Sequence, residues 1–159
     1  MTHIFNITDQ IGAIVTGNMV DAKNIITRLK MQAAEFKFKN GYRIPVHVLV
    51  QKHAEFCQLS TQRVGMRTLC VVITIVGIDE EKGPQVFKVD PAGFAMGYKA
   101  IAAGAKEQEA INHLEKVYKK KKEWGDVNDS IQTAISTLMS VIGTDFKAHE
   151  LELGVATVD

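Results

Sequence analysis

The hydrophobic pattern opens with two short alternating runs, residues 3–8 and 11–16, joined by the polar pair Asp9-Gln10. Alternation with a period of two is typical of strands with one buried face. The short polar connection predicts that these two strands form a hairpin. Farther along, residues 69–78 are almost continuously apolar and β-branched. This run predicts a central strand covered on both faces by other layers.

Two helices are predicted between the hairpin and the central strand. Asn18 can cap the first helix, which Asn40-Gly41 closes, and Pro45 opens a second helix that ends before Gly65. Apolar residues recur three or four positions apart in both, so the two helices should pack as neighbours. The residues expected inside are Ile25, Leu29, Ala33 and Phe36 in the first helix, and Val46, Leu49, Val50, His53 and Cys57 in the second.

The stretch 83–114 reads as the part around which the rest of the chain is organised, with two short strands, a tight turn, a third strand and the start of a helix. Pro84 marks a strand entrance because it cannot donate a ladder hydrogen bond. Asp90, Pro91 and Gly93 occupy turn positions that these residue types favour. Small residues then leave little side chain on the backbone, which predicts close approach of another layer. They are Gly97, Ala100, Ala102, Ala103 and Gly104.

Two helices and a final strand are predicted for the remainder. Trp124-Gly125 interrupts the first helix, and the second runs from a cap at Asp126 to Gly143, with Gln132 pointing outward. The inward residues expected are Ala110, Ile111, Leu114, Val117 and Tyr118, then Ile131, Ala134, Ile135, Leu138 and Ile142. Residues 151–158 alternate as a strand. This order of elements favours a layered α+β sandwich.

Composition narrows the classes of function. A chain of 159 residues, 46% hydrophobic and 23% charged, suits a single domain over residues 1–159. A formal net charge of +1 gives no global field for a polyanion, so nucleic acid is not an expected partner. No apolar run is long enough for a bilayer span and no signal peptide is apparent, so no membrane partner is expected. Cys57 and Cys70 cannot build a disulfide framework and fit a reducing compartment.

Sites for metals and cofactors are not expected. The five histidines share no ligand spacing with the two cysteines, and the glycines form no nucleotide-binding fingerprint. The histidines are His3, His47, His53, His113 and His149. The lysine run at residues 119–122 complements the end of a helix and faces water, with a polyanion patch as the alternative.

The residues around the turn resemble the proteasome alpha subunits, in which an Asp-Pro-x-Gly turn and a Tyr-Lys-Ala strand lead to a helix carrying Leu-Glu. The matching residues are Asp90-Pro91-Ala92-Gly93, Tyr98-Lys99-Ala100 and Leu114-Glu115. The resemblance extends over essentially the whole chain, through Gly77-Ile78-Asp79, Gly83-Pro84, Asp145-Phe146-Lys147 and Glu152-Leu153-Gly154-Val155. Among the alpha types, the chain looks most like alpha type 6.

This resemblance implies a four-layer αββα sandwich of the N-terminal-nucleophile hydrolase type, incomplete at its N- and C-terminal ends. It implies a non-catalytic structural subunit of the 20S proteasome alpha ring that supports ring assembly, substrate gating and activator docking. The implied process is ubiquitin-dependent protein degradation in the cytoplasm and nucleus. The implied partners are other alpha and beta subunits and the regulatory particle or other activators. Uncovered sheet edges predict self-association, with the strand at residues 3–8 the likeliest to be displaced.

The alternative is a self-standing N-terminal-nucleophile threonine peptidase, because removal of Met1 would expose Thr2. No acidic and lysine partners match in register, and residues 102–105 carry no hydroxyl where active beta subunits have Ser-Gly. No catalytic residue is therefore expected. His3 aligns with a lysine of the pocket that receives activator tails, where a neutral histidine would hold a carboxylate less well. The other interpretation of His3 is a strand-end histidine exposed by truncation.

Overall fold

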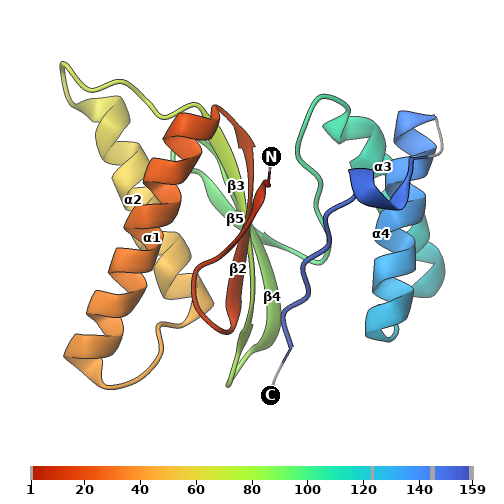
Figure 1. Ribbon diagram of the computed structural model, residues 1–159, viewed down its shortest axis with the longest axis horizontal. Helices are drawn as coiled ribbons and strands as arrows, with labels where there is room; N and C mark the ends of the chain where they lie inside the picture. Colours follow the sequence, from red (N-terminus) through yellow and green to blue (C-terminus); the bar gives the residue numbers. More distant parts are fainter. Residues whose placement is uncertain (1, 123, 144–145, 158–159) are drawn as a thin grey trace. The chain divides into compact units, whose positions relative to one another are not determined.

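The structure, a computed structural model, describes residues 2–122, 124–143 and 146–157 (Figure 1). The chain divides into two compact units. The first comprises Met1–Lys99 and Glu152–Asp159, and the second comprises Ala100–Leu151. Each unit is described by itself below.

The first unit contains a five-stranded antiparallel sheet in the order β1-β2-β3-β4-β5. Its strands are β1 Ile4–Asn6, β2 Ile11–Gly17, β3 Val71–Asp79, β4 Gly83–Val89 and β5 Ala95–Tyr98. The predicted opening hairpin is confirmed as β1 and β2, and the predicted central strand is β3. Sequence order equals spatial order, so every neighbouring pair is joined without a crossover.

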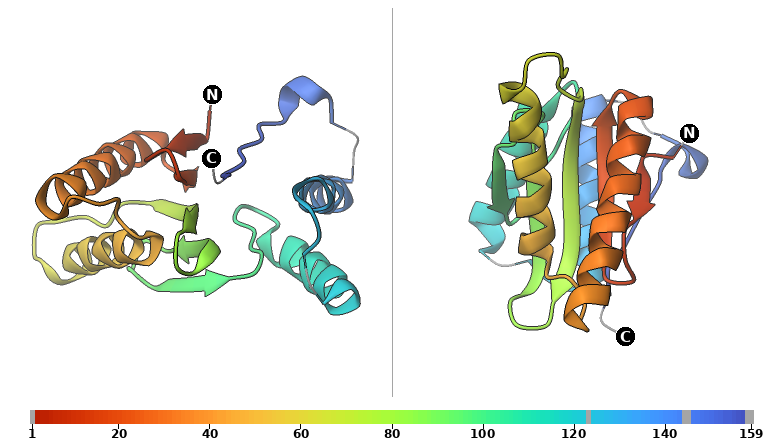
Figure 2. Two further views of the ribbon diagram at one scale, coloured as in Figure 1. Left: turned by 90° about the horizontal axis from the view of Figure 1, so that it is seen from below. Right: turned by 90° about the vertical axis from the view of Figure 1, so that its left-hand side faces the viewer.

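Two helices, α1 Met19–Asn40 and α2 Val46–Gln62, lie side by side on one face of this sheet (Figure 2). The Asn18 side chain caps α1 by accepting from the backbone N–H of Val20 at 2.9 Å. Gly41 ends α1 in the left-handed conformation, and Pro45 precedes α2. The predicted inner faces are confirmed, with Phe36 half-buried and the other eight residues buried.

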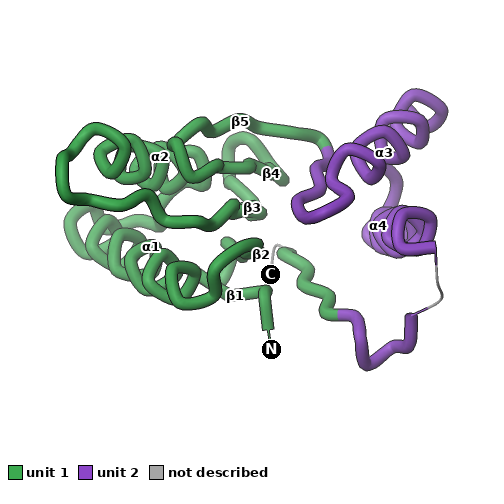
Figure 3. The backbone as a smooth tube through the Cα atoms, turned by 90° about the horizontal axis from the view of Figure 1, so that it is seen from above, with its two compact units in different colours: residues 1–99, 152–159 green, residues 100–151 purple. Residues whose placement is uncertain are grey.

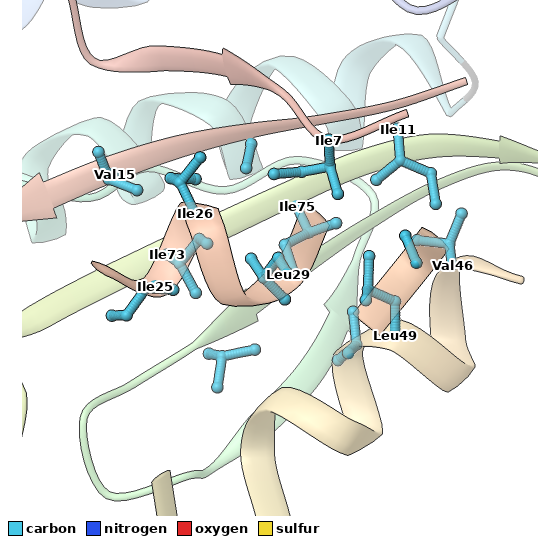
Figure 4. Close-up of a cluster of buried hydrophobic side chains, with 14 of the residues drawn as sticks. Ile7, Ile11, Val15, Ile25, Ile26, Leu29, Val46, Leu49, Ile73 and Ile75 are labelled. Atoms are coloured by element: carbon cyan, nitrogen blue, oxygen red, sulfur yellow. The ribbon is translucent and has the colours of Figure 1, made fainter. Parts of the chain in front are cut away.

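The core lies between these helices and the two strands β2 and β3 (Figure 4). Leu29 of α1, Leu49 of α2, and Ile73 and Ile75 of β3 are each 0% exposed. On the other face of β3, Val72 and Val76 are half-buried. The helices of this unit therefore cover one face of a strand that is apolar on both faces.

The stretch 83–114 differs from its prediction in two ways. Its first part is the single strand β4, not two short strands, because all seven residues continue the ladder opposite β3. It is also not the centre of packing, since the core is built by β2, β3 and the two helices. The stretch instead runs from the first unit into the second at Ala100.

An ion pair joins the start of α1 to the segment that follows α2. The Arg67 guanidinium donates to both carboxylate oxygens of Asp21, from Nη2 at 2.6 Å and from Nη1 at 2.7 Å. The backbone N–H of Cys70 adds a third hydrogen bond to the same carboxylate. These bonds, led by the one from Arg67, lower the pKa of Asp21. The buried carboxylate is therefore held charged and fully partnered.

The second unit contains two helices, α3 Glu107–Lys121 and α4 Val127–Ile142, and a short 3₁₀ turn at Ala148–Glu150 (Figure 3). Asp126 caps α4 as predicted, since its carboxylate accepts from the Val127 N–H at 2.7 Å. His113 of α3 and Thr137 of α4 are joined by a 3.0 Å hydrogen bond. The Lys106 ammonium donates to the Val141 carbonyl at 2.8 Å. These two bonds fix how the helices pair.

The inner face of α3 agrees with its prediction, because Ala110 is buried and the other four expected residues are half-buried. The prediction for α4 is wrong for three residues: Ala134 is exposed, Leu138 is 42% exposed and Ile142 is 50% exposed. The buried residues are instead Thr133 and Thr137. These threonines can face α3 because each hydroxyl has a hydrogen-bond partner. The Thr133 hydroxyl donates to the Asp129 carbonyl. The Thr137 hydroxyl donates to the Thr133 carbonyl and also lies within hydrogen-bond distance of His113. Ile131 and Ile135 are half-buried and Gln132 is exposed, as expected.

The final strand predicted at residues 151–158 is not formed over residues 151–157. Val158, within that prediction, lies outside the described residues, as does Asp145 of the Asp145-Phe146-Lys147 segment. The segment is attached to the first unit by side chains and not by a backbone ladder. Glu152 bonds to the start of the chain, and a Cβ on Gly154 would lie 3.1 Å from Ile4 Cγ2. Alternation in the sequence cannot distinguish such a segment from a paired strand.

Candidate functional site

The turn between β4 and β5 rests directly on α2. Asp90 Oδ1 accepts from the N–H groups of Ala92 at 2.9 Å and Phe94 at 2.8 Å, so its side chain holds the reversal of the chain. Gly93 has a φ of 86°, and a Cβ there would lie 2.5 Å from the Ala54 carbonyl oxygen of α2. Pro91 lies half-buried between Asp90 and this glycine. The turn therefore needs glycine both for its conformation and for its contact with the helix.

The remaining predicted packing residues lie in different surroundings. Pro84 is the second residue of β4, opposite Ile78. A Cβ on Gly97 would lie 3.2 Å from the Phe87 ring of the neighbouring strand. Gly104 has a φ of 134°, and a Cβ there would meet no described atom within 4 Å. Backbone conformation, and not close approach of another layer, therefore explains the glycine at this position.

Residues at the start of the chain bind the carboxylate of Glu152. The backbone N–H of His3 donates to Glu152 Oε2 at 3.0 Å, and the Thr2 hydroxyl lies 3.0 Å from the same oxygen. The His3 N–H, followed by the Thr2 hydroxyl, lowers the pKa of Glu152. The exposed His3 ring places Nδ1 3.2 Å from the Val15 carbonyl of β2. Thr2 and His3 thus hold the charged carboxylate of Glu152 at the start of the chain.

Sequence reasoning singled out Thr2 and His3 but missed Glu152. This glutamate is separated from His3 by 149 positions, and no local pattern connects them. The Thr2 hydroxyl also lies 3.2 Å from the Ile4 carbonyl. Among the described residues, its partners include a carboxylate and a carbonyl but no lysine nitrogen. These contacts position the hydroxyl, but none of them is a lysine that could assist the threonine's own α-amine in activating it.

A buried histidine and cysteine lie together on the inner face of α2. His53 Nε2 is 3.6 Å from Cys57 Sγ, and His53 Nδ1 has no hydrogen-bond partner in the described part of the chain. Burial, aided by the charge of Arg28, lowers the pKa of His53 to about 4, and burial raises the pKa of Cys57 to about 11. Both groups are neutral near pH 7, so the pair is not an activated thiolate.

Acid is expected to destabilise the protein through His53. The pKa of His53 is about 4 in the fold and close to 6.5 in an unfolded chain, so the folded protein binds this proton less tightly. The contribution to stability is therefore complete above about pH 6.5 and is lost as the pH falls toward 4. The full loss corresponds to about 3 kcal/mol.

Urea unfolding between pH 7 and pH 4 measures this effect. The His53→Leu variant should show a flatter dependence of its unfolding free energy on pH than the natural chain. The matched control, His149→Leu, changes an exposed histidine and should keep the natural pH dependence. If His53→Leu and the natural chain lost stability in parallel, His53 would not be the titrating group.

Other candidate chemistry receives no support from the described residues. No group of three or more histidines, cysteines, aspartates and glutamates there could hold a metal ion. In the lysine run, Lys119 pairs with Glu115 and Lys121 with Asp129, while Lys122 closes α3 in the left-handed conformation. The run is thus explained as the end of a helix. Within the same described ranges, no helix has the length and apolar character needed to cross a bilayer.

Comparison with known proteins identifies the family. The family pattern described as "Proteasome subunit" matches residues 1–156. The chain therefore belongs to the proteasome subunit family. The similar proteins below carry the alpha designation, and this chain is an alpha-type subunit.

Three relatives illustrate the similarity. The chain is 48% identical over 157 residues to a probable proteasome subunit alpha type-1 of Schizosaccharomyces pombe, covering 99% of this chain and 64% of the relative. It is 38% identical over 159 residues to proteasome subunit alpha type-6 of Caenorhabditis elegans, covering 100% of this chain and 64% of the relative. It is 30% identical over 152 residues to proteasome subunit alpha of Methanopyrus kandleri, covering 96% and 60%.

These sequence identities and coverages concern the alpha subtype and the share of each relative that the chain spans. A type-6 subunit is among the relatives, as the resemblance implied, but identity to the type-1 subunit is higher, 48% against 38%. The chain spans 64% of the length of each of these two relatives.

Proposed function

We propose that this chain acts as a non-catalytic structural subunit of the 20S proteasome alpha ring. The observation that carries the proposal is the family match over residues 1–156, together with alpha-type relatives that cover nearly the whole chain. The role comprises ring assembly, control of substrate entry and docking of activators during ubiquitin-dependent protein degradation. The partners are other alpha and beta subunits and the regulatory particle or other activators, in the cytoplasm and nucleus.

The proposal includes a finer fold than the five-stranded sheet. We propose that the subunit forms the four-layer αββα sandwich, as one domain. Two features support a further layer. On β3, Val72 and Val76 present apolar side chains on the face away from α1 and α2. On α4, Leu138 and Ile142 are about half exposed. Apolar surface of this kind is usually covered by another part of the protein or by a partner.

Co-expression tests the structural role. The protein would be tagged, co-expressed with other proteasome subunits, purified with its associated proteins and analysed by native mass spectrometry. The expected product is a ring that contains one or more copies of the tagged chain beside other alpha subunits. Recovery of only free tagged protein, from cells whose other subunits form intact rings, would contradict the proposal.

A second experiment separates the structural role from peptidase activity. A threonine-directed electrophile should leave Thr2 unlabelled, because no lysine is among the described contacts of the Thr2 hydroxyl to help activate it. Peptide mapping by mass spectrometry would locate any adduct, with purified active 20S particles as the positive control. Labelling at Thr2 that Thr2→Val abolishes would favour the peptidase instead.

We propose further that the His3 region accepts the carboxylate of an activator tail. In support, the His3 N–H and the Thr2 hydroxyl already bind the Glu152 carboxylate. Because Glu152 occupies these donors, Glu152→Gln should strengthen the binding of a tail peptide with a free carboxyl terminus to assembled rings, by about threefold to tenfold. Glu81→Gln, an exposed change elsewhere, is the control. Equal binding of the free-acid and amidated peptides would exclude a carboxylate site.

A further inference from the structure

Helix α1 has an exposed face that runs along almost its whole length. Residues on this face recur at alternating spacings of four and three positions, and all of them are exposed. They are Val20, Asn24, Thr27, Met31, Ala34 and Phe38, which together form the α1 seam. Alternating spacings of this kind are the heptad pattern with which helices pack in coiled coils. In the right-hand view of Figure 2, no other segment of the first unit lies in front of α1.

The large apolar residues of the α1 seam lie open to water. Val20 is 78% exposed, Met31 is 66% exposed and Phe38 is 91% exposed. A helix that packed along the seam would remove these three side chains from water, which is favourable. Ala34 is small, so a large side chain of that helix could lie over it between Met31 and Phe38.

Three lysines follow one flank of the α1 seam. Lys23, Lys30 and Lys37 lie seven positions apart, are exposed, and each comes directly before a residue of the seam. In a coiled coil, side chains at this position pair with charges of the partner helix and decide which partner is accepted. Within the described part of the chain, the three ammonium groups take part in no ion pair or hydrogen bond. They are therefore available to carboxylates of a partner.

The charged groups on the other flank of the seam are engaged within the fold. The carboxylates of Asp21 and Glu35, the acidic residues of α1, each accept from a basic side chain of this chain. The Arg28 guanidinium lies over an aromatic ring of α2. Asp9, in the turn before β2, pairs with Arg43 at 3.6 Å. The charge left unpaired beside the seam is thus cationic, and it favours an acidic partner.

We propose that the α1 seam binds an amphipathic helix of another protein, with acidic residues on both flanks of its apolar stripe. The stripe packs along the seam, and the carboxylates pair with Lys23, Lys30 and Lys37. A second copy of this chain is disfavoured, because an antiparallel copy would set the same lysines against one another. A parallel copy would set Lys23 against a second Arg28. The proposal rests only on residues of the first unit, so it holds independently of the proteasomal role.

A labelled helical peptide tests the proposal with the chain described here. The probe is a capped peptide of three repeats of Glu-Leu-Ala-Gln-Leu-Glu-Ala, in which the leucines form one stripe and glutamates flank it on both sides. Fluorescence anisotropy should show saturable binding that weakens as salt is added, because the pairing charges are exposed. A second peptide with lysine in place of every glutamate keeps the apolar stripe. Its binding should be at least about tenfold weaker.

Two matched pairs of variants locate the site. Lys30→Glu reverses a charge beside the seam, and Lys82→Glu makes the same change at an exposed position between β3 and β4. Lys30→Glu should weaken binding of the acidic probe at least about threefold and strengthen binding of the lysine peptide, whereas Lys82→Glu should do neither. Phe38→Ala should also weaken probe binding at least about threefold, and Val64→Ala, at another fully exposed apolar residue, should not. Thermal unfolding checks that each variant is folded.

Several results would overturn the proposal. These are no saturable binding of the acidic probe, equal binding of the lysine peptide, or equal effects of Lys30→Glu and Lys82→Glu in folded variants. Vesicles of phosphatidylcholine and phosphatidylserine examine a membrane as the competing occupant. Co-sedimentation that Lys30→Glu reduces, without binding of the probe, would assign the seam to an anionic membrane surface instead. A dimer in light scattering that Phe38→Ala dissolves, again without probe binding, would assign it to self-association.

Discussion

Gly93→Val is expected to destabilise the protein by roughly 2 to 6 kcal/mol, from two separate causes. The φ of Gly93 is 86°, and forcing a β-branched residue into this region costs on the order of 1 to 3 kcal/mol. A Cβ there would also lie 2.5 Å from the Ala54 carbonyl oxygen and 2.9 Å from the Gln58 backbone nitrogen. Because backbone atoms cannot rotate away, the turn or α2 must shift, which costs a similar amount again. Urea unfolding at pH 7 measures the total.

Gly83→Val separates the two causes. Gly83 has a φ of 70°, but a Cβ there would meet no described atom within 4 Å. This control therefore carries the conformational cost without the contact, and it should destabilise by less than Gly93→Val. Equal losses in the two variants would mean that the contact between the turn and α2 contributes nothing to stability.

Leu49→Ala is expected to cost roughly 2 to 5 kcal/mol, whereas Leu138→Ala should cost less than about 1 kcal/mol. Leu49 is 0% exposed at the centre of the core, and truncation leaves a cavity among Leu29, Ile73 and their neighbours. Leu138 is 42% exposed on α4, so its truncation removes little buried surface. Denaturant midpoints of the two variants provide the comparison.

The comparison of Leu138→Ala with Leu49→Ala tests whether the Leu138 face of α4 is buried. A loss of more than about 2 kcal/mol for Leu138→Ala would mean that Leu138 is covered in solution, as the sequence alone predicts. Thr137→Val provides a second measurement, since it removes the hydroxyl that bonds to His113 while keeping the shape of the side chain. A destabilised Thr137→Val variant supports the threonine face as the one packed on α3.

The first unit could be predicted from sequence because its signals are local. Asn18 and Gly41 delimit α1 through their own caps, and Pro45 opens α2. Helical spacing identified the buried faces of both helices because a single layer, the sheet, covers each of them. The strand β3 was recognisable from its uninterrupted apolar residues.

The errors arise where the outcome depends on distant partners. Spacing shows that α4 has an apolar face, but it does not show that Thr137 would find His113 and turn the threonine side inward. Alternation at residues 151–157 does not reveal whether a backbone ladder is available, and Glu152 is held by side-chain bonds to Thr2 and His3 instead. Separation along the sequence is also the reason why Glu152 was not predicted as a residue of the candidate site.

The ion pair between Asp21 and Arg67 has a consequence for how the fold opens. It joins the first turn of α1 to the segment beyond α2, so both helices lie within one loop closed by these two side chains. Helix α1 therefore cannot leave the sheet without breaking the pair or drawing along the segment that follows α2. Amide hydrogens in the first turn of α1 and in the segment after α2 should therefore exchange with solvent in one cooperative step. In Asp21→Asn that step should divide, with the first turn of α1 exchanging before the rest.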